Sequence, residues 1–156
     1  MVEYEQLLQD AANDNVQVFE QYDLTDTRLK GLYCDGAIAL NKELKTKKER
    51  KCVLAEELGH HYTATGDILD QSLTGCRKQE IHGRAYAYNR LVGLMGIIDA
   101  YKHQCTNLKE SAEYLDVTEE FLDEAVSYYK SKYGTRVTVD NYTIFFEPYV
   151  AVLELV

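Results

Sequence analysis

The sequence predicts an α+β fold in which a small antiparallel sheet packs on a pair of long helices, followed by further helices and C-terminal strands. Apolar residues recur at helical spacing through the middle of the chain, whereas short alternating patterns occur near both ends. An Asp-Gly pair between two apolar runs adds the signal of a β-hairpin. With 156 residues, of which 46% are hydrophobic, the chain is long and apolar enough for one domain with its own core.

The N-terminal third is expected to form a helix and then the sheet. Apolar residues at helical spacing predict a helix over Tyr4–Asn13, and the run Val16–Phe19 predicts a strand. Two more strands are expected over Lys30–Tyr33 and Ala37–Leu40, which flank the Asp-Gly pair. Together these segments predict a small antiparallel sheet.

A capping box marks the start of the next helix. Thr46 and Glu49 have the spacing at which the hydroxyl accepts from the third backbone N–H while the carboxylate reaches back. The helix is predicted over Lys47–Thr63, with Gly66 as a left-handed cap at its end. A second long helix is predicted over Arg77–Tyr101.

Two shorter helices and then strands are expected in the C-terminal part. The helices are predicted over Leu108–Leu115 and Thr118–Lys132, with Thr118 as the N-cap and Gly134 after the last turn. Residues 136–156 contain apolar side chains at period two, which predicts strands.

Charge and composition argue against several functions. The net charge is −9. The segment Leu108–Gly134 resembles a helix-turn-helix, but its second helix begins with the acidic Glu119 and Glu120, so we expect packing or docking there and no direct nucleic-acid binding. No apolar run reaches the roughly 18–20 residues of a membrane span, and the acidic start does not resemble a signal peptide. The four cysteines occur singly, as is typical of reduced thiols. We therefore expect a cytoplasmic protein without membrane contact.

The stretch LAEELGHHYT, at Leu54–Thr63, carries two adjacent carboxylates followed within one helical turn by two adjacent imidazoles. Glu56 and His60 lie four residues apart, on one helix face, and can bind one ion. Glu57 lies about 100° around the helix, where it can hold a water. Because hydrolytic zinc sites use three protein ligands, a third is needed, and Glu80 in the next predicted helix is the candidate. Gly59 leaves room beside His60 for another chain segment.

An ordinary charged helix is the alternative interpretation of this stretch. Taken alone, Glu56 and His60 form a common i,i+4 pair on a solvated face, and so short a motif favours that interpretation. The surrounding residues favour a buried helix, in which charges need partners or a metal. These apolar neighbours are Val53, Leu54, Leu58 and Tyr62.

Two segments, CVLAEELGHHYTATGDI and RKQEIHGRAYAYNRLV, resemble the ImmA/IrrE family of metallopeptidases. LKGLYCDGAIALNKEL resembles the sheet segment of that family, and VDNYTIFFEPYVAVLEL resembles the tail of its phage-borne members. The resemblance implies a zincin-like fold and a cytoplasmic metal-dependent endopeptidase that cleaves a helix-turn-helix repressor of a phage or mobile element. It implies that Glu57 is catalytic and that Glu56, His60 and Glu80 bind the metal. Residues 1–104 would form the metallopeptidase core, with residues 105–156 packed on it in one compact domain.

The chain departs from the family at Glu56, where the family has a histidine. Two carboxylates and one imidazole form a harder ligand set, so Zn²⁺ is the first expectation and Mn²⁺ and Fe²⁺ are alternatives. This departure leaves open a non-proteolytic anti-repressor that binds the repressor, with the metal structural or absent. His61 also lies four residues after Glu57, but the family register favours His60 as the ligand. His61, Tyr62 and Tyr86 are therefore expected behind the ligands or facing the substrate.

Overall fold

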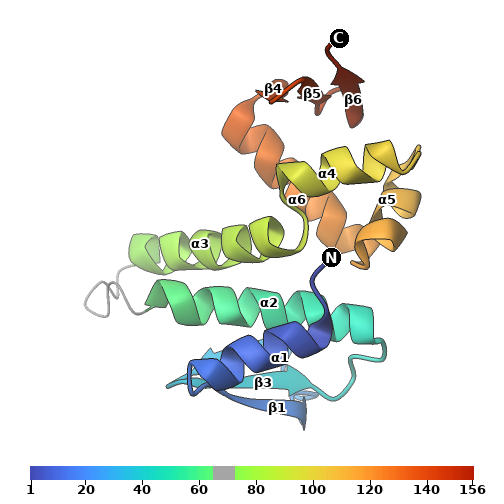
Figure 1. Cartoon of the computed structure of the whole chain (residues 1–156). Coiled ribbons are helices and arrows are strands. Elements are labelled where there is room, and N and C mark those ends of the chain that lie inside the picture. Colours follow the sequence, from blue (N-terminus) through green and yellow to red (C-terminus); the bar gives the residue numbers. More distant parts are fainter. Residues whose placement is uncertain (65–72) are drawn as a thin grey trace. The chain divides into compact units, whose positions relative to one another are not determined.

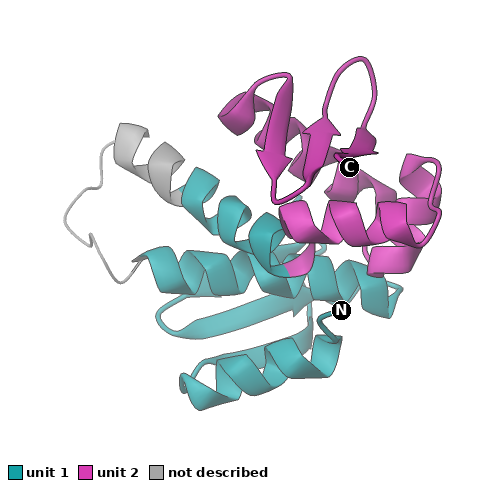
Figure 2. Ribbon diagram, turned by 45° about the horizontal axis from the view of Figure 1, so that its top comes forward, with its two compact units in different colours: residues 1–90 teal, residues 91–156 magenta. Residues whose placement is uncertain are grey.

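Helices and two small sheets alternate along the chain in the computed structural model shown in Figure 1. Residues 1–64 and 73–156 are described, and the side chains of residues 64–79 lie outside that description. Two compact units, Met1–Arg90 and Leu91–Val156, each combine helices with a three-stranded sheet (Figure 2). The predicted α+β class is confirmed.

The N-terminal unit begins with α1 (Tyr4–Asn13), as predicted, and continues through β1 (Gln17–Tyr22), β2 (Gly31–Cys34) and β3 (Ala37–Asn41). The strand order is β1-β3-β2. β2 and β3 form the predicted antiparallel hairpin, but β1 pairs with β3 in parallel, so the prediction of a fully antiparallel sheet was wrong. The tight turn folds β3 back along β2 and leaves its other edge to β1, a non-local pairing that no local pattern indicates.

The next helix, α2 (Lys47–Ala64), is confirmed together with its N-cap. The Thr46 hydroxyl accepts from the Glu49 backbone N–H at 3.1 Å, and the Glu49 carboxylate reaches back to the N–H of Lys45 at 3.2 Å. α2 packs on α1, β2 and β3, and it buries Leu54 and Leu58 completely. The predicted cap at Gly66 lies outside the described residues.

The predicted helix over Arg77–Tyr101 is in fact two helices, α3 (Leu73–Leu91) and α4 (Gly93–Lys102). The break falls at Gly93, whose φ of 67° is in the left-handed region that favours glycine. The two compact units divide beside this break, at Arg90 and Leu91, earlier than the boundary at residue 104 expected from the sequence. The division lies there because α4 packs on the helix that follows it.

The C-terminal unit continues with the two predicted short helices, α5 (Leu108–Leu115) and α6 (Glu119–Tyr133). The Thr118 hydroxyl accepts from the Phe121 N–H at 3.1 Å, which confirms the predicted N-cap, and Gly134 follows α6 with a φ of 85°. The predicted tail strands are β4 (Arg136–Val139), β5 (Tyr142–Phe145) and β6 (Ala151–Glu154), which form an antiparallel sheet.

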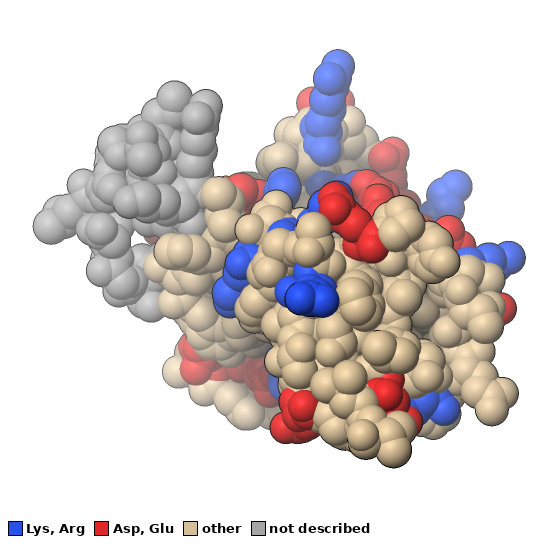
Figure 3. Space-filling view, turned by 90° about the horizontal axis from the view of Figure 1, so that it is seen from above, with Lys and Arg blue, Asp and Glu red and all other residues tan. Residues whose placement is uncertain are grey.

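The second helix of the α5–α6 pair begins with acidic residues at the surface. Glu119 and Glu120 are exposed at the start of α6, where a DNA-reading helix would meet phosphates. On the face drawn in Figure 3, the charged side chains of the described residues are scattered, with acidic and basic groups interspersed among uncharged ones. Among the helices of residues 1–64 and 73–156, none is both long and apolar enough to cross a lipid bilayer.

Candidate metal centre

Two faces of α2 carry the candidate site. One face, with Gly59 and His60, meets α3, where both lie against Gly83. The other, with Glu57 and His61, meets β2, because Glu57 lies against Gly31 and His61 contacts a tyrosine of that strand. The i,i+4 spacing predicted two pairs of carboxylate and imidazole, Glu56 with His60 and Glu57 with His61. Because α2 packs between α3 and β2, His60 and His61 have different neighbours.

The approach of α3 to α2 depends on two glycines. A Cβ atom on Gly59 would lie 2.1 Å from the carbonyl oxygen of Gly83, and a Cβ atom on Gly83 would lie 2.5 Å from Nδ1 of His60. Neither separation is open to a real Cβ atom, so Gly59 permits the close approach of the two backbones and Gly83 leaves room for the His60 ring. The expectation that another chain segment approaches beside His60 is confirmed, and that segment is α3.

This approach brings two of the three predicted metal ligands together. His60 Nε2 lies 3.3 Å from Glu80 Oε2, while the other carboxylate oxygen of Glu80 pairs with Arg84 Nε at 3.0 Å. Burial lowers the pKa of His60, and Arg84 lowers it further while Glu80 raises it. A lowered pKa favours the neutral imidazole, which is the form that binds metal ions.

Glu56 is the third predicted ligand, but it does not form a metal-binding cluster with His60 and Glu80 among the described residues. In the part of the chain that the structure describes, no group of three or more His, Cys, Asp or Glu side chains is arranged to hold a metal ion. His60 and Glu80 therefore meet as a pair that also includes Arg84, and the convergence of all three ligands stays a prediction. Charge nonetheless fits a cation here, because the negative charges of Glu56 and Glu80 both act on the carboxyl group of Glu57.

Glu57 has a strongly perturbed carboxyl group. Its side chain is buried, and burial, followed by the charges of Glu56 and Glu80, raises its pKa from 4.5 to about 7. Gly31 of β2 shields it on one side, since a Cβ there would lie 3.2 Å from Oε1 of Glu57. A carboxyl group with a pKa near neutrality can both accept and return a proton at physiological pH.

The raised pKa gives a pH prediction for the metal-free protein. Because the folded-state pKa lies above the free value, the contribution of Glu57 to stability is fully present below pH 4.5 and is lost as the pH rises through about 7. The loss is on the order of 3 kcal/mol. Glu57→Gln, which stays neutral, should therefore be more stable than wild type at pH 8 and nearly equal to it at pH 4.5.

Urea unfolding of both proteins with a chelator present, at the two pH values, measures this difference. Glu43→Gln, at an exposed position after β3, is the control for loss of a charge. A stability difference between wild type and Glu57→Gln that is the same at pH 4.5 and pH 8 would contradict the burial argument.

His61 is held on both sides by the protein. Its Nδ1 lies 2.8 Å from the Tyr33 hydroxyl of β2, and its Nε2 lies 3.1 Å from Oδ2 of Asp14, just after α1. Neither partner of His61 is a proposed ligand, so its expected place behind the ligands or facing the substrate stays a prediction. Asp14 and Tyr33 were missed from the sequence because they lie 47 and 28 residues from His61, too far apart for any local spacing to link them.

Tyr62 and Tyr86 form a pair between α2 and α3, and Tyr62 also lies next to His61. Their ring centroids are 5.1 Å apart, and the ring of Tyr62 is 5.3 Å from that of His61. Burial raises the pKa of both phenols, so each keeps its proton at neutral pH. Arg90 of α3 anchors this side of the helix pair to α1 through an ion pair with Asp10 at 2.8 Å.

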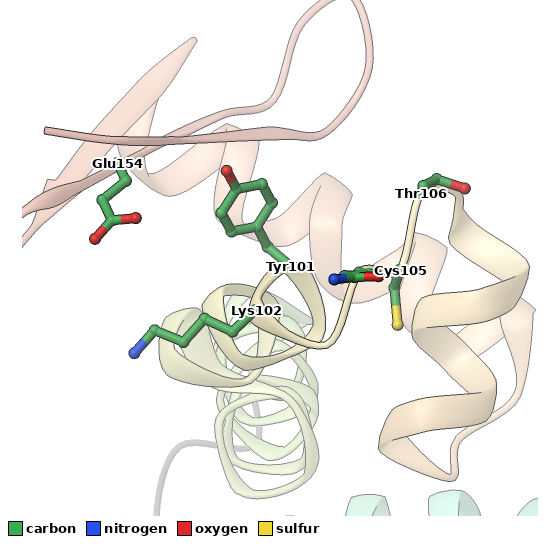
Figure 4. A pocket seen from close by; sticks show the side chains of 6 residues that line it. Tyr101, Lys102, Cys105, Thr106 and Glu154 are labelled. Carbon is green, nitrogen blue, oxygen red and sulfur yellow. The ribbon is translucent and has the colours of Figure 1, made fainter.

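Two open cavities of about 420 Å³ lie away from these residues. One is in the N-terminal unit, and its lining includes Tyr4, Lys47 and Arg50. The other, in the C-terminal unit, has Lys102 and Glu154 in its lining (Figure 4). Both linings mix acidic and basic side chains, so neither selects a ligand of one charge.

Comparison with protein-family models, with curated proteins and with solved structures found no match to this chain. The resemblance to the ImmA/IrrE family thus rests on the motifs of the two helices and the hairpin. The arrangement of α2, α3 and β2 is therefore the basis for a proposed function.

Proposed function

We propose that this protein is a zincin-like, metal-dependent endopeptidase of the cytoplasm, in which Glu56, His60 and Glu80 hold a divalent cation and Glu57 is the general base. The observation that carries the proposal is the meeting of His60 and Glu80, 3.3 Å apart, beside the buried Glu57. Zn²⁺ is the first candidate, and the two carboxylates also suit Mn²⁺ or Fe²⁺.

The residues of α2 divide the work of peptide hydrolysis. A divalent cation, when bound, polarises the peptide carbonyl and makes a water more acidic. Glu57 takes the proton of the attacking water and then gives it to the leaving amine, for which a pKa of about 7 is suited. Burial keeps His60 neutral for ligation, and Gly83 leaves room for its ring.

Strand β2 offers a place for an extended substrate. It is an edge of the sheet, and the Lys30 carbonyl accepts from the Asn41 N–H at 2.9 Å. Hydrogen-bonded pairs alternate along an antiparallel ladder, so Gly31 and Tyr33 turn their backbone groups toward the open edge. A peptide can add there as a further strand, beside Glu57. The natural substrate that the family resemblance suggests is a helix-turn-helix repressor of a phage or mobile element.

One observation favours a second candidate, an anti-repressor that binds the repressor without cutting it. Glu80 is shared between His60 and Arg84, and Glu56, His60 and Glu80 do not form one cluster among the described residues. If Arg84 keeps Glu80, the charge of that carboxylate is balanced within α3, and a metal is structural or absent.

Cleavage of a peptide library tests the proposed function without assuming a substrate. Purified protein loaded with Zn²⁺ or Mn²⁺ should produce new peptide termini, detected by mass spectrometry, and a chelator should abolish them. Re-adding the metal should restore them. If none of Zn²⁺, Mn²⁺ or Fe²⁺ gives new termini, and the folded protein still relieves repression in a reporter assay, the non-proteolytic candidate is favoured.

A further inference from the structure

Three side chains from distant parts of the N-terminal unit form a continuous hydrogen-bonded chain beside the candidate site. Asp14, after α1, contacts His61 of α2 at 3.1 Å, and His61 contacts the Tyr33 hydroxyl of β2 at 2.8 Å. The rings of Tyr33 and His61 meet edge to face, with centroids 5.4 Å apart. The proposed hydrolytic steps use none of these three groups.

The direction of each hydrogen bond follows from the chemistry of the groups. An ionised Asp14 carboxylate can only accept, so Nε2 of His61 carries the proton that it donates. In the neutral imidazole, Nδ1 is then the acceptor, and the Tyr33 hydroxyl donates to it. Both ring nitrogens of His61 are thus engaged within the protein, and neither is available to donate to a reacting carbonyl oxygen. Asp14 and His61 therefore act on β2 through Tyr33.

β2 contacts α2 at two positions on the same side of the strand. At the first, Gly31 lies so close to α2 that a Cβ would be 2.6 Å from Val53 and 3.1 Å from Cγ of Glu57. At the second, two residues further on, Tyr33 bonds His61. The first contact has no side chain of β2 to hold it, so the hydrogen bond of Tyr33 is the directional contact that, together with the ladder to β3, holds the strand at this distance from Glu57.

We propose that Asp14, His61 and Tyr33 are positioning residues that seat the edge strand β2 on α2 and so set the path of an extended peptide backbone past Glu57. This inference rests on the proposed function and specifies how its substrate is aligned. It predicts that the three hydrogen-bonded side chains affect substrate binding and the rigidity of β2. They do not take part in proton transfer, because none of them reaches the reacting atoms through a free donor.

Tyr33→Phe and Asp14→Asn test the proposal, because each removes or alters one link while keeping the shape of the side chain. A hydrogen bond contributes about 0.5–1.5 kcal/mol, which corresponds to roughly a 2- to 12-fold change. KM for a cleaved peptide should rise by about that factor in each variant, with kcat changed less. The double variant should cost little more than either single one, since both break the same chain.

Two further measurements make the test independent of peptidase activity. Amide hydrogen exchange at Leu32, which faces β3 in the ladder, should accelerate by a similar factor in both variants. Tyr22→Phe, on exposed β1, and Asp26→Asn, in the loop before β2, are matched controls and should leave both exchange and KM unchanged. The metal content of the two test variants should equal that of wild type.

The outcomes separate this proposal from the proposed function. Exchange at Leu32 that is as slow as in wild type in both variants would overturn the proposal that these side chains position β2. A fall in kcat with unchanged KM would also overturn it, because the three side chains would then take part in the chemical step. If wild type cleaves nothing, the peptidase proposal is wrong. In that case faster exchange in both variants still supports the seating of β2, and unchanged exchange overturns it.

Discussion

Glu57→Gln is expected to lose cleavage of a repressor by about 10²–10⁴-fold while keeping the bound metal and the bound repressor. The amide preserves the shape of the side chain and its hydrogen-bonding reach, but it cannot accept the proton of the attacking water, and general-base catalysis contributes a factor of that size. Glu57 is not among the proposed ligands, so removing its charge leaves Glu56, His60 and Glu80 intact. The variant should also fold, because burial already favours a neutral group at this position.

The experiment mixes wild type, Glu57→Gln and the control Glu43→Gln with a helix-turn-helix repressor and metal. Mass spectrometry detects fragments, and a reporter gene measures relief of repression. Glu43→Gln should cleave like wild type. Equal cleavage by Glu57→Gln would show that Glu57 is not the base. Relief of repression by wild type and Glu57→Gln without fragments would establish the non-proteolytic anti-repressor instead.

Gly59→Ala is expected to destabilise the N-terminal unit and to weaken metal binding together. The new Cβ would lie 2.1 Å from the backbone carbonyl of Gly83, which cannot move aside as a flexible side chain can. Overpacking of this kind costs about 1–3 kcal/mol, more than the roughly 1 kcal/mol that alanine gains over glycine within a helix. Pushing α3 away also separates Glu80 from His60, so the metal affinity should fall along with the melting temperature.

Gly96→Ala in α4 is the matched control for Gly59→Ala. Its Cβ would meet the end of the Leu115 side chain at 3.3 Å, a contact that a small rotation relieves. Thermal melts and metal titrations of both variants measure the effect. A Gly59→Ala protein that is as stable as Gly96→Ala and binds metal like wild type would contradict the close packing of α2 on α3.

Local signals in the sequence predicted most of the helices and strands. α1 and α5 have the predicted bounds, since helical spacing and caps lie within the segments themselves. The break at Gly93 was missed because a glycine inside an apolar helical pattern is compatible with a continuous helix, and the pattern does not reveal its left-handed φ. The parallel pairing of β1 with β3 was missed because these strands are not consecutive in the chain and meet only when it folds.

Sequence reasoning found the candidate-site residues that lie close together in the chain and missed those that come from distant elements. The i,i+4 spacing on α2 indicated Glu56, Glu57 and His60, and the family resemblance added Glu80 from the next helix. Asp14 and Tyr33, which hold His61, come from two other elements and carry no spacing signal. The burial that raises the pKa of Glu57 is likewise a property of the packed helix and strand, not of the motif.

The metal content of the protein shows whether Glu56, His60 and Glu80 form a metal site. Protein purified without chelator and dialysed against trace Zn²⁺, Mn²⁺ or Fe²⁺ is analysed for metal, together with Glu57→Gln, His60→Ala and Glu80→Ala. We expect one ion per chain in wild type and Glu57→Gln, and loss of that ion in His60→Ala and Glu80→Ala. A wild type that binds none of the three metals, or metal retained in full by both alanine variants, would contradict it.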